Sequence, residues 1–269
     1  MNKKNYKCKK PNSRHAIDSV KNSIIYSPEY FGFKKIKGNG FGVNVCIIDT
    51  GLPSNKYLPS ITKRSIDFTN SSVLDKHGHS TGVSGIINSQ AKGNVIGIAP
   101  KSSLWHAKAI GDNGSGEHGA VQASILYAIV QNVDIIVMSF GCDSMHPFLH
   151  DAIKKAYNNG ICMFAAAGNN KSHTRDANFP ARLKEVMSVG LCDNKKIQTG
   201  KIEAPSIDMP LDSIYTTYLN DKFIKMGGSS VAAPVVAGAA ACIIQQERIA
   251  GNTIKPVDVY KKLMESTKN

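Results

Sequence analysis

Residues 43–51 read VNVCIIDTG, an apolar and β-branched run that ends in a carboxylate and a turn glycine. A short apolar run bounded by a turn signal is typical of a strand that is buried on both faces of a parallel sheet. Asp49 would then lie at the carboxyl end of that strand, where α/β sheets collect their functional groups. Taken alone, an Asp that caps a turn is the simpler explanation of this segment.

Further runs of this kind alternate along the chain with segments of helical period. Strands are expected at 104–110, 133–138, 161–166 and 186–191, and helices at 119–131, 150–157, 230–246 and 257–264. This alternation predicts an α/β fold: a single domain with a mostly parallel β-sheet flanked by helices on both faces. We assign residues 21–269 to this domain, and we expect the lysine-rich residues 1–20 to form a solvated, flexible arm.

The composition limits the classes of function. The formal net charge is +13, but Lys and Arg are spread along the chain and only 7% of residues are aromatic, so we expect solubility and attraction to acidic peptides rather than nucleic-acid binding. No apolar run approaches a membrane span, and no apolar signal core follows the basic N-terminus. These features predict a cytoplasmic protein without a membrane partner, or a secreted one if a signal and propeptide have been removed.

The six cysteines are scattered, without a CxxC pair and without a histidine at metal-ligand spacing. We therefore predict free thiols and no metal centre built from them.

A second informative segment, residues 75–87, reads DKHGHSTGVSGII and places His79 at the start of a helix of small residues. A histidine there can accept a proton on one ring nitrogen while the other nitrogen donates to a buried carboxylate. His77 lies two residues away, a spacing that does not place both rings on one helical face, so a general base is favoured over a metal site.

The third segment, residues 227–238, reads GGSSVAAPVVAG and opens a helix after a glycine turn. A serine at a helix N-terminus lies close to unpaired backbone N–H groups, which would stabilise a developing oxyanion. For a lone serine, a plain N-cap would be the simpler interpretation.

Together the three segments resemble the subtilisin (subtilase) family, whose triad follows the chain order Asp, His, Ser; the resemblance covers about residues 43–267. It implies the subtilisin-like fold and a serine endopeptidase. The family pattern Gly-His-x-Thr selects His79 over His77, and Gly-x-Ser-x-Ala-x-Pro selects Ser230 over Ser229. The triad implied is Asp49, His79 and Ser230.

The resemblance also implies a set of substrate contacts. Residues 165–169, AAAGN, are similar to the family segment whose asparagine donates to the oxyanion, which assigns that role to Asn169. An extended peptide substrate would add as a strand between two segments of the chain. The implied substrate-binding residues are Ser139, Phe140 and Gly141 on one edge, Gly114, Ser115 and Gly116 on the other, His77 near the S2 pocket, and Ala165, Ala166, Ala167, Gly168 and Asn178 around the S1 pocket.

No cofactor is expected. Calcium-dependent relatives hold the ion with a carboxylate at the position of Leu58 and with a loop that corresponds to residues 88–94, which lacks carboxylates here. A hard cation needs several oxygen ligands, so the tight calcium site is predicted to be absent, while a weak site elsewhere stays open.

The sequence leaves three readings of the activity. A selective processing protease, as in relatives that remove acidic leader peptides from lanthipeptide precursors, suits the charge of +13. A general intracellular degradative subtilisin is the second reading. A pseudoprotease that binds peptides without cutting is the third, and the intact triad counts against it.

Overall fold

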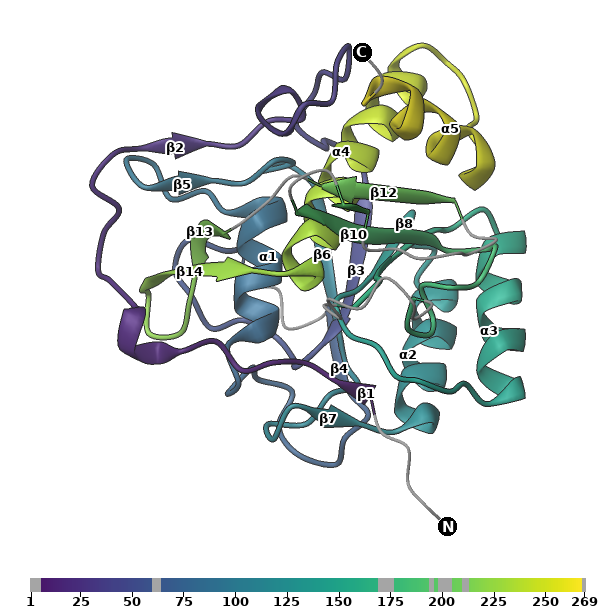
Figure 1. Ribbon diagram of the computed structural model, residues 1–269, viewed down its shortest axis with the longest axis horizontal. Coiled ribbons are helices and arrows are strands. Elements are labelled where there is room, and N and C mark those ends of the chain that lie inside the picture. The colour runs from purple at the N-terminus through teal and green to yellow at the C-terminus, as the bar shows by residue number, and fades with distance from the viewer. Residues whose placement is uncertain are drawn as a thin grey trace.

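The computed structural model of the chain describes residues 6–59, 64–168, 177–193, 196–197, 205–209 and 213–267. Its centre is a parallel sheet in which β3 (Asn44–Asp49) is an inner strand (Figure 1). On one side of β3 lie β6 (Ser103–Lys108) and β4 (Ser65–Asp67); on the other lie β8 (Ile135–Met138), β9 (Cys162–Ala166) and β10 (Met187–Asp193). Beyond β9, β10 pairs with β12 (Ser206–Met209) in parallel and with β11 (Lys196–Ile197) antiparallel.

The register of the parallel strands brings their carboxyl ends to one edge. Asp49 on β3 pairs with Lys108 on β6, and Ile48 pairs with Met138 on β8. Met138 in turn pairs with Ala165 on β9. The segments that follow these strands therefore leave the sheet next to one another, as the sequence predicts for the candidate site.

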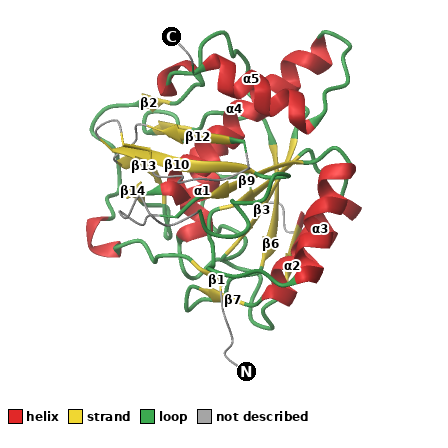
Figure 2. Cartoon of the chain, turned by 45° about the vertical axis from the view of Figure 1, so that its right-hand side comes forward, coloured by secondary structure: helices red, strands yellow, loops and turns green. Residues whose placement is uncertain are grey.

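Helices cover both faces of the sheet (Figure 2). One face carries α1 (His79–Asn88), α4 (Ser229–Ile249) and α5 (Pro256–Ser266). The opposite face carries α2 (His118–Val130) and α3 (Pro147–Asn158). This arrangement confirms the predicted fold class, and the expected strands and helices are all found at these positions, shifted by a few residues at their ends.

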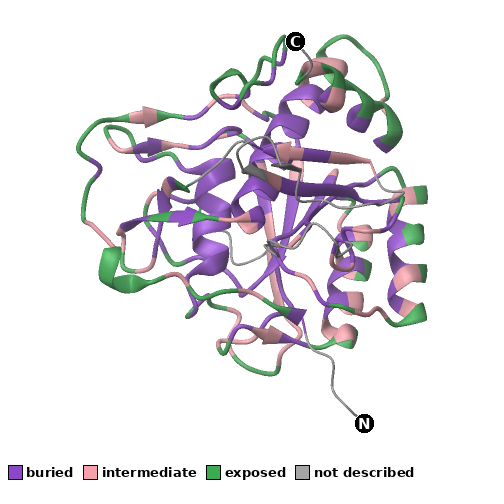
Figure 3. Cartoon of the chain, viewed as in Figure 1, coloured by how far each residue is buried: buried purple, intermediate pink, exposed green. Residues whose placement is uncertain are grey.

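The alternation along β3 shows why its four inner residues, 45–48, are all apolar. Val45 and Ile47 point into the core beneath α1 and α4, whereas Cys46 and Ile48 point into the core beneath α2 and α3. All of these side chains are at most 1% exposed, and Figure 3 shows the same contrast between buried strands and the exposed outer faces of α2 and α3. Because the strand is buried on both faces between Asn44 and Asp49, polar side chains occur only at its two ends.

Helix α4 is the longest element in the described part of the chain. It is long and apolar enough to cross a membrane, but 83% of its apolar window is buried inside the domain, which is the pattern of a core helix. Its small residues allow close packing: a Cβ atom on Gly238 would lie 1.8 Å from the Cγ2 atom of Ile98. No other helix of this kind is found in the part of the chain that the structure describes.

Several short elements were not predicted from the sequence. They are the hairpin of β13 (Ser213–Thr217) and β14 (Phe223–Gly227), the pair β2 (Ile24–Ile25) and β5 (Val95–Ile96), the strand β1 (Tyr6–Lys7), and the 3-10 turns Ser13–His15 and Glu29–Phe31. Strand β1 pairs with β7 (Ser115–Gly116), which lies in the predicted substrate-binding edge.

Residues 6–20 pack against the domain. Tyr6 is 0% exposed, Ile17 exchanges backbone hydrogen bonds with Phe223, and Val20 is buried. The division of the chain at residue 20 stays a prediction. The described cysteines Cys8, Cys46, Cys162 and Cys242 are free thiols, as predicted.

Candidate active site

The buried pair Asp49 and His79 lies where β3 ends and α1 begins. The Nδ1 atom of His79 lies 2.8 Å from Oδ1 and 2.9 Å from Oδ2 of Asp49, and Asp49 also accepts a hydrogen bond of 2.7 Å from the backbone N–H of Thr50. The carboxylate is 0% and the histidine 1% exposed. Because the carboxylate accepts, Nδ1 carries the proton and the other ring nitrogen, Nε2, is left as an acceptor.

The environment of His79 shifts its pKa in two opposing ways. Burial alone lowers the pKa because it disfavours the charged ring, but the carboxylates of Asp49 and, to a smaller extent, Asp75 together outweigh this effect. The net pKa lies above the ordinary value of 6.5. A buried histidine that is stabilised in its protonated form by a carboxylate has the properties of a general base.

Asp75 fixes the start of α1. Its Oδ1 accepts from the Thr50 hydroxyl and from the backbone N–H groups of His77 and Gly78, and its Oδ2 accepts from the Thr81 N–H and hydroxyl, all at 2.6–3.0 Å. A carboxylate there satisfies orphan N–H groups at a helix N-terminus. The sequence analysis did not predict this role, because Asp75 precedes the N-cap Gly78 by three residues and so does not fit the usual spacing of a capping residue.

Gly78 explains why a glycine precedes His79. It adopts a φ of 90°, in the left-handed region, and a Cβ atom there would lie 2.3 Å from the Tyr218 ring. The glycine therefore sets both the turn into α1 and the direction of the histidine.

Ser230 lies in the first turn of α4, after Gly228, and is half-buried. Helix α4 packs against α1, the helix that carries His79. The backbone N–H of Gly168 donates a 3.2 Å hydrogen bond to the Ser229 hydroxyl, which ties the segment after β9 to the start of α4. Asn169, the predicted oxyanion donor, lies outside the described residues.

The two predicted edges of the peptide-binding cleft are occupied by the N-terminal segment of the chain itself. Tyr6 and Lys7 pair antiparallel with Gly116 and Ser115, the Cys8 N–H donates to the Gly114 oxygen at 3.0 Å, and the Lys7 N–H donates to the Gly141 oxygen at 3.4 Å. An extended strand of this chain therefore lies between the two segments that the sequence assigns to substrate binding. The flanking lysines weaken the apolar pattern that would predict this strand. The alternation of Tyr6 and Cys8 with lysine was its only signal in the sequence.

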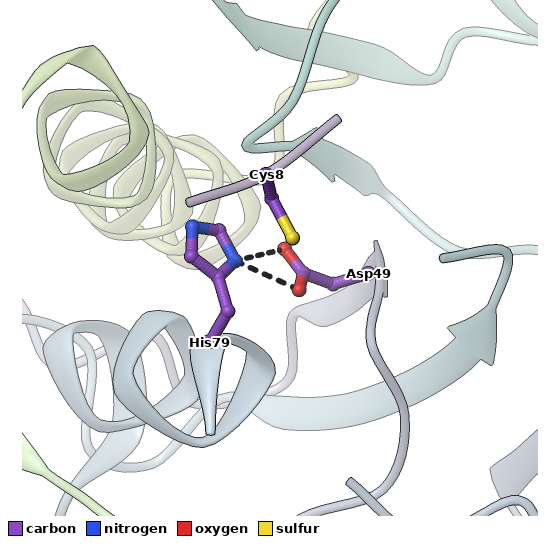
Figure 4. A group of neighbouring side chains, drawn as sticks. All are labelled: Cys8, Asp49 and His79. Carbon is purple, nitrogen blue, oxygen red and sulfur yellow. Dashed lines mark hydrogen bonds and ion pairs between the residues drawn. The ribbon is translucent and has the colours of Figure 1, made fainter. Parts of the chain in front are cut away.

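The side chains of this strand alternate as in any strand. The Tyr6 ring is fully buried and makes edge contacts with His118, at 5.1 Å between centroids, and with Phe140, at 5.2 Å. Burial also raises the pKa of its hydroxyl far above the ordinary value. Lys7 is exposed, and the Cys8 thiol points towards the Asp49 carboxylate (Figure 4).

The other predicted contact residues gather near the same place. Asn178 donates its backbone N–H to the Ala167 oxygen at 3.0 Å, and Cβ atoms built on Gly141 and Gly168 would lie 2.7 and 3.0 Å from the Asn178 side chain. Buried neighbours of this region are Ser139, Ala165 and Ala166.

Two further predictions concern His77 and calcium. A Cβ atom on Gly114 would lie 3.0 Å from the Nε2 atom of His77 and 2.8 Å from the Cys8 oxygen, so this histidine lies beside the strand in the cleft. Leu58 is buried and apolar, and the absence of a calcium site stays a prediction.

Comparison with known proteins agrees with this geometry. Residues 40–269 match the Subtilase family. The chain is 34% identical to the major intracellular serine protease of Bacillus subtilis (strain 168) over 83% of this chain and 74% of that protein. It is 33% identical to subtilisin DY of Bacillus licheniformis, over 79% of this chain and 81% of the relative, and 28% identical to thermitase of Thermoactinomyces vulgaris, over 86% and 88%. The chain belongs to the subtilase family and is a serine-type endopeptidase.

Proposed function

We propose that Asp49, His79 and Ser230 hydrolyse peptide bonds through an acyl-enzyme, and that the enzyme is a selective processing protease for acidic peptides. The observation that carries the proposal is the buried hydrogen-bonded pair of Asp49 and His79 beside a cleft that binds an extended strand along both edges. Backbone pairing supplies affinity for any extended peptide, and side-chain pockets supply selectivity.

In the first half of the reaction, His79 Nε2 takes the proton of the Ser230 hydroxyl while its oxygen attacks the carbonyl carbon of the substrate. Asp49 holds the tautomer and stabilises the imidazolium that forms. The oxyanion is stabilised by the backbone N–H of Ser230 and the side-chain amide of Asn169. His79 then gives the proton to the departing amine, which leaves an ester on Ser230. In the second half, His79 takes a proton from water while the water oxygen attacks this ester, the bond to the Ser230 oxygen breaks, His79 returns the proton to that oxygen, and the acid product leaves.

Selectivity is supported by the way the chain's own strand fits the cleft. A fully buried Tyr6 is followed by an exposed lysine and a half-buried cysteine, so the cleft accepts a large ring at one position and leaves the next one unconstrained. A pocket that encloses a whole ring discriminates between side chains, because filling it with a small residue leaves apolar surface unburied.

The substrate class is supported by charge. A chain with a net charge of +13 attracts acidic peptides over long range and speeds their encounter with the cleft. Leader peptides of lanthipeptide precursors are an acidic class that fits, and cleavage would take place in the cytoplasm where such precursors are made. Relatives named as intracellular serine proteases, from Bacillus subtilis and Paenibacillus polymyxa, support that location.

The second candidate is a general intracellular degradative protease, and the names of the same two relatives favour it equally. Unfolded casein and one acidic leader peptide would distinguish the two. A processing enzyme cuts the leader at one bond, with a kcat/KM that falls steeply as salt is added, and barely cuts casein; a degradative enzyme cuts both at many bonds.

The test of the reaction is mass spectrometry of a proteome-derived peptide library incubated with the enzyme and, in parallel, with Ser230→Ala. Cuts that vanish in Ser230→Ala and persist with EDTA support the serine mechanism. Ser229→Ala is the matched control, since it removes the neighbouring hydroxyl and should keep the same cut sites. Identical cuts from Ser230→Ala would overturn the assignment, and retention of peptides without any cut by the wild type would indicate a pseudoprotease.

A further inference from the structure

The strand in the cleft brings a thiol to the catalytic pair. The Cys8 Sγ atom, a carboxylate oxygen of Asp49 and a ring nitrogen of His79 all lie within 4.8 Å of one another. Among the described residues this is the single group of three or more His, Cys, Asp or Glu side chains with such spacing. Cys8 lies on a different segment from the pair, and its position is fixed by the backbone pairing of residues 6–8 with Gly114, Ser115 and Gly116.

The three ligand types of this group favour Zn²⁺ over Ca²⁺ and Mg²⁺. One thiolate, one imidazole and one carboxylate are the ligands of Zn²⁺ sites, whereas Ca²⁺ and Mg²⁺ take oxygen ligands alone. With metal–ligand distances of about 2.0 to 2.3 Å and a tetrahedral arrangement, the ligand atoms lie roughly 3.3 to 3.8 Å apart. The 4.8 Å group needs only a small contraction around Cys8, and the 2.8 Å contact of Asp49 and His79 must open by roughly half an ångström.

We propose that Cys8, Asp49 and His79 form a Zn²⁺ site that locks the N-terminal strand in the cleft and holds the enzyme inactive. Binding releases the thiol proton of Cys8 to solvent and moves the imidazole proton of His79 from Nδ1 to Nε2, so that Nδ1 is free to bind the metal. The fourth metal position takes water, as in zinc sites with three protein ligands. The proposal concerns the control of the same site and rests on the proposed function only for its effect on activity.

The metal and catalysis exclude each other for two reasons. The ion replaces the hydrogen bond between Asp49 and His79, and it leaves the proton on Nε2, so His79 no longer accepts the proton of Ser230. The ion also holds the strand that fills the substrate cleft. When the strand leaves, the metal loses its thiolate, so metal affinity and occupancy of the cleft by the strand are coupled and each strengthens the other.

A second histidine next to the site is consistent with a metal. His77 is 1% exposed, its ring centroid lies 6.2 Å from that of His79, and its Nδ1 atom has no hydrogen-bond partner among the described residues. A buried ring nitrogen without a partner is costly in a site without a ligand.

Metal binding is tested in the full chain carrying Ser230→Ala, which removes self-digestion and makes the result independent of any protease activity. Under reducing conditions, Co²⁺ is titrated as a spectroscopic substitute for zinc, and Zn²⁺ affinity is measured by competition with a chromogenic chelator. We expect one ion per chain and the near-ultraviolet charge-transfer band of a thiolate bound to Co²⁺. Adding Cys8→Ser should abolish the band and weaken Zn²⁺ binding by roughly tenfold or more. Cys142→Ser, which removes another thiol near Tyr6, should leave both unchanged.

Activity is measured separately in the otherwise wild-type enzyme. Zn²⁺ at the concentration that fills the site should inhibit peptide cleavage, EDTA should restore it, and Cys8→Ser should need at least roughly tenfold more Zn²⁺ for the same inhibition. A thiolate band that survives Cys8→Ser, or Zn²⁺ affinity that Cys8→Ser leaves unchanged, would overturn the metal site. An enzyme without protease activity whose Co²⁺ band depends on Cys8 would instead overturn the proposed function and leave the site standing.

Discussion

Two buried carboxylates flank the first turn of α1, and they differ in what surrounds them. Asp75 accepts five hydrogen bonds, three from backbone N–H groups and two from the hydroxyls of Thr50 and Thr81. Asp49 accepts one backbone bond from Thr50 and otherwise faces the imidazole of His79. Both side chains are at most 4% exposed, so burial does not distinguish them.

This difference separates a carboxylate that stabilises the backbone from one that takes part in the reaction. Asp75 is saturated by donors that do not titrate, so it holds the backbone before α1 in one conformation. Asp49 is hydrogen-bonded to His79, which gains and loses a proton, so the electrostatic interaction between the two side chains changes during the reaction. Thr50 connects the two, since its N–H donates to Asp49 and its hydroxyl donates to Asp75.

The largest effect is expected for Asp49→Asn, which removes the charge and keeps the size of the side chain. The amide favours the wrong tautomer of His79, so kcat should fall by about 10⁴-fold. The free energy of unfolding should change much less than in the variant of Asp75. Steady-state kinetics and urea denaturation measure the two quantities, and a loss of kcat below tenfold would remove Asp49 from the triad.

Asp75→Asn should show the reverse pattern. An NH₂ group replaces one carboxylate oxygen and then faces N–H and O–H groups that also donate. The variant should therefore lose roughly 2 to 4 kcal/mol of unfolding free energy. After correction for the folded fraction, its kcat should exceed that of Asp49→Asn by a wide margin. Asp67→Asn, at a partly exposed acid that ends β4 and accepts only local hydrogen bonds from Thr69 and Ser71, is a control that should change stability less. Equal loss of kcat in the two main variants would contradict the separation of roles.

The pH dependence of kcat/KM reports how Asp49 changes the pKa of His79. The neutral form of His79 is the base, and its pKa is raised above 6.5, so kcat/KM should fall roughly tenfold per pH unit below that raised pKa. In Asp49→Asn the charge that raises the pKa is gone, so the acidic limb should move to lower pH. A limb at the same pH in both proteins would assign the titration to another group.

The smallest effect concerns the strand in the cleft. Tyr6→Ala removes the buried ring, so the strand should be displaced more easily and the apparent KM for a short peptide should fall by up to about tenfold when metal is chelated. Tyr30→Ala, at a tyrosine that is 59% exposed, is the control and should leave KM unchanged. An unchanged KM in Tyr6→Ala would mean that the strand does not compete with substrate.

Much of the fold followed from local patterns. The apolar runs that became β3, β8 and β9 are buried on both faces, which leaves few alternatives for a run of four or five apolar residues. The hairpin of β13 and β14 was missed because its exposed lysine and hydroxyl side chains dilute the apolar signal, and its partner is the α1 helix rather than the sheet.

The candidate site divides in the same way. The pairing of Asp49 with His79 was predicted from the motifs and is found in the structure, whereas the capping role of Asp75 depends on donors from two segments, at Thr50 and at 77–81. The position of Asn169 lies outside the described residues.

Local sequence patterns were enough to predict the parallel α/β domain, the strand that ends at Asp49 and the helix starts that carry His79 and Ser230. Periodicity, turns and helix starts each depend on residues that are neighbours in the sequence. The strand that lies in the cleft, by contrast, depends on tertiary contacts and was found only in the structure. Residues 6–8 are too short, and too closely flanked by lysines, to form a strand alone, and they become one where two distant segments offer unpaired backbone groups. That pairing brings Cys8 to the catalytic pair.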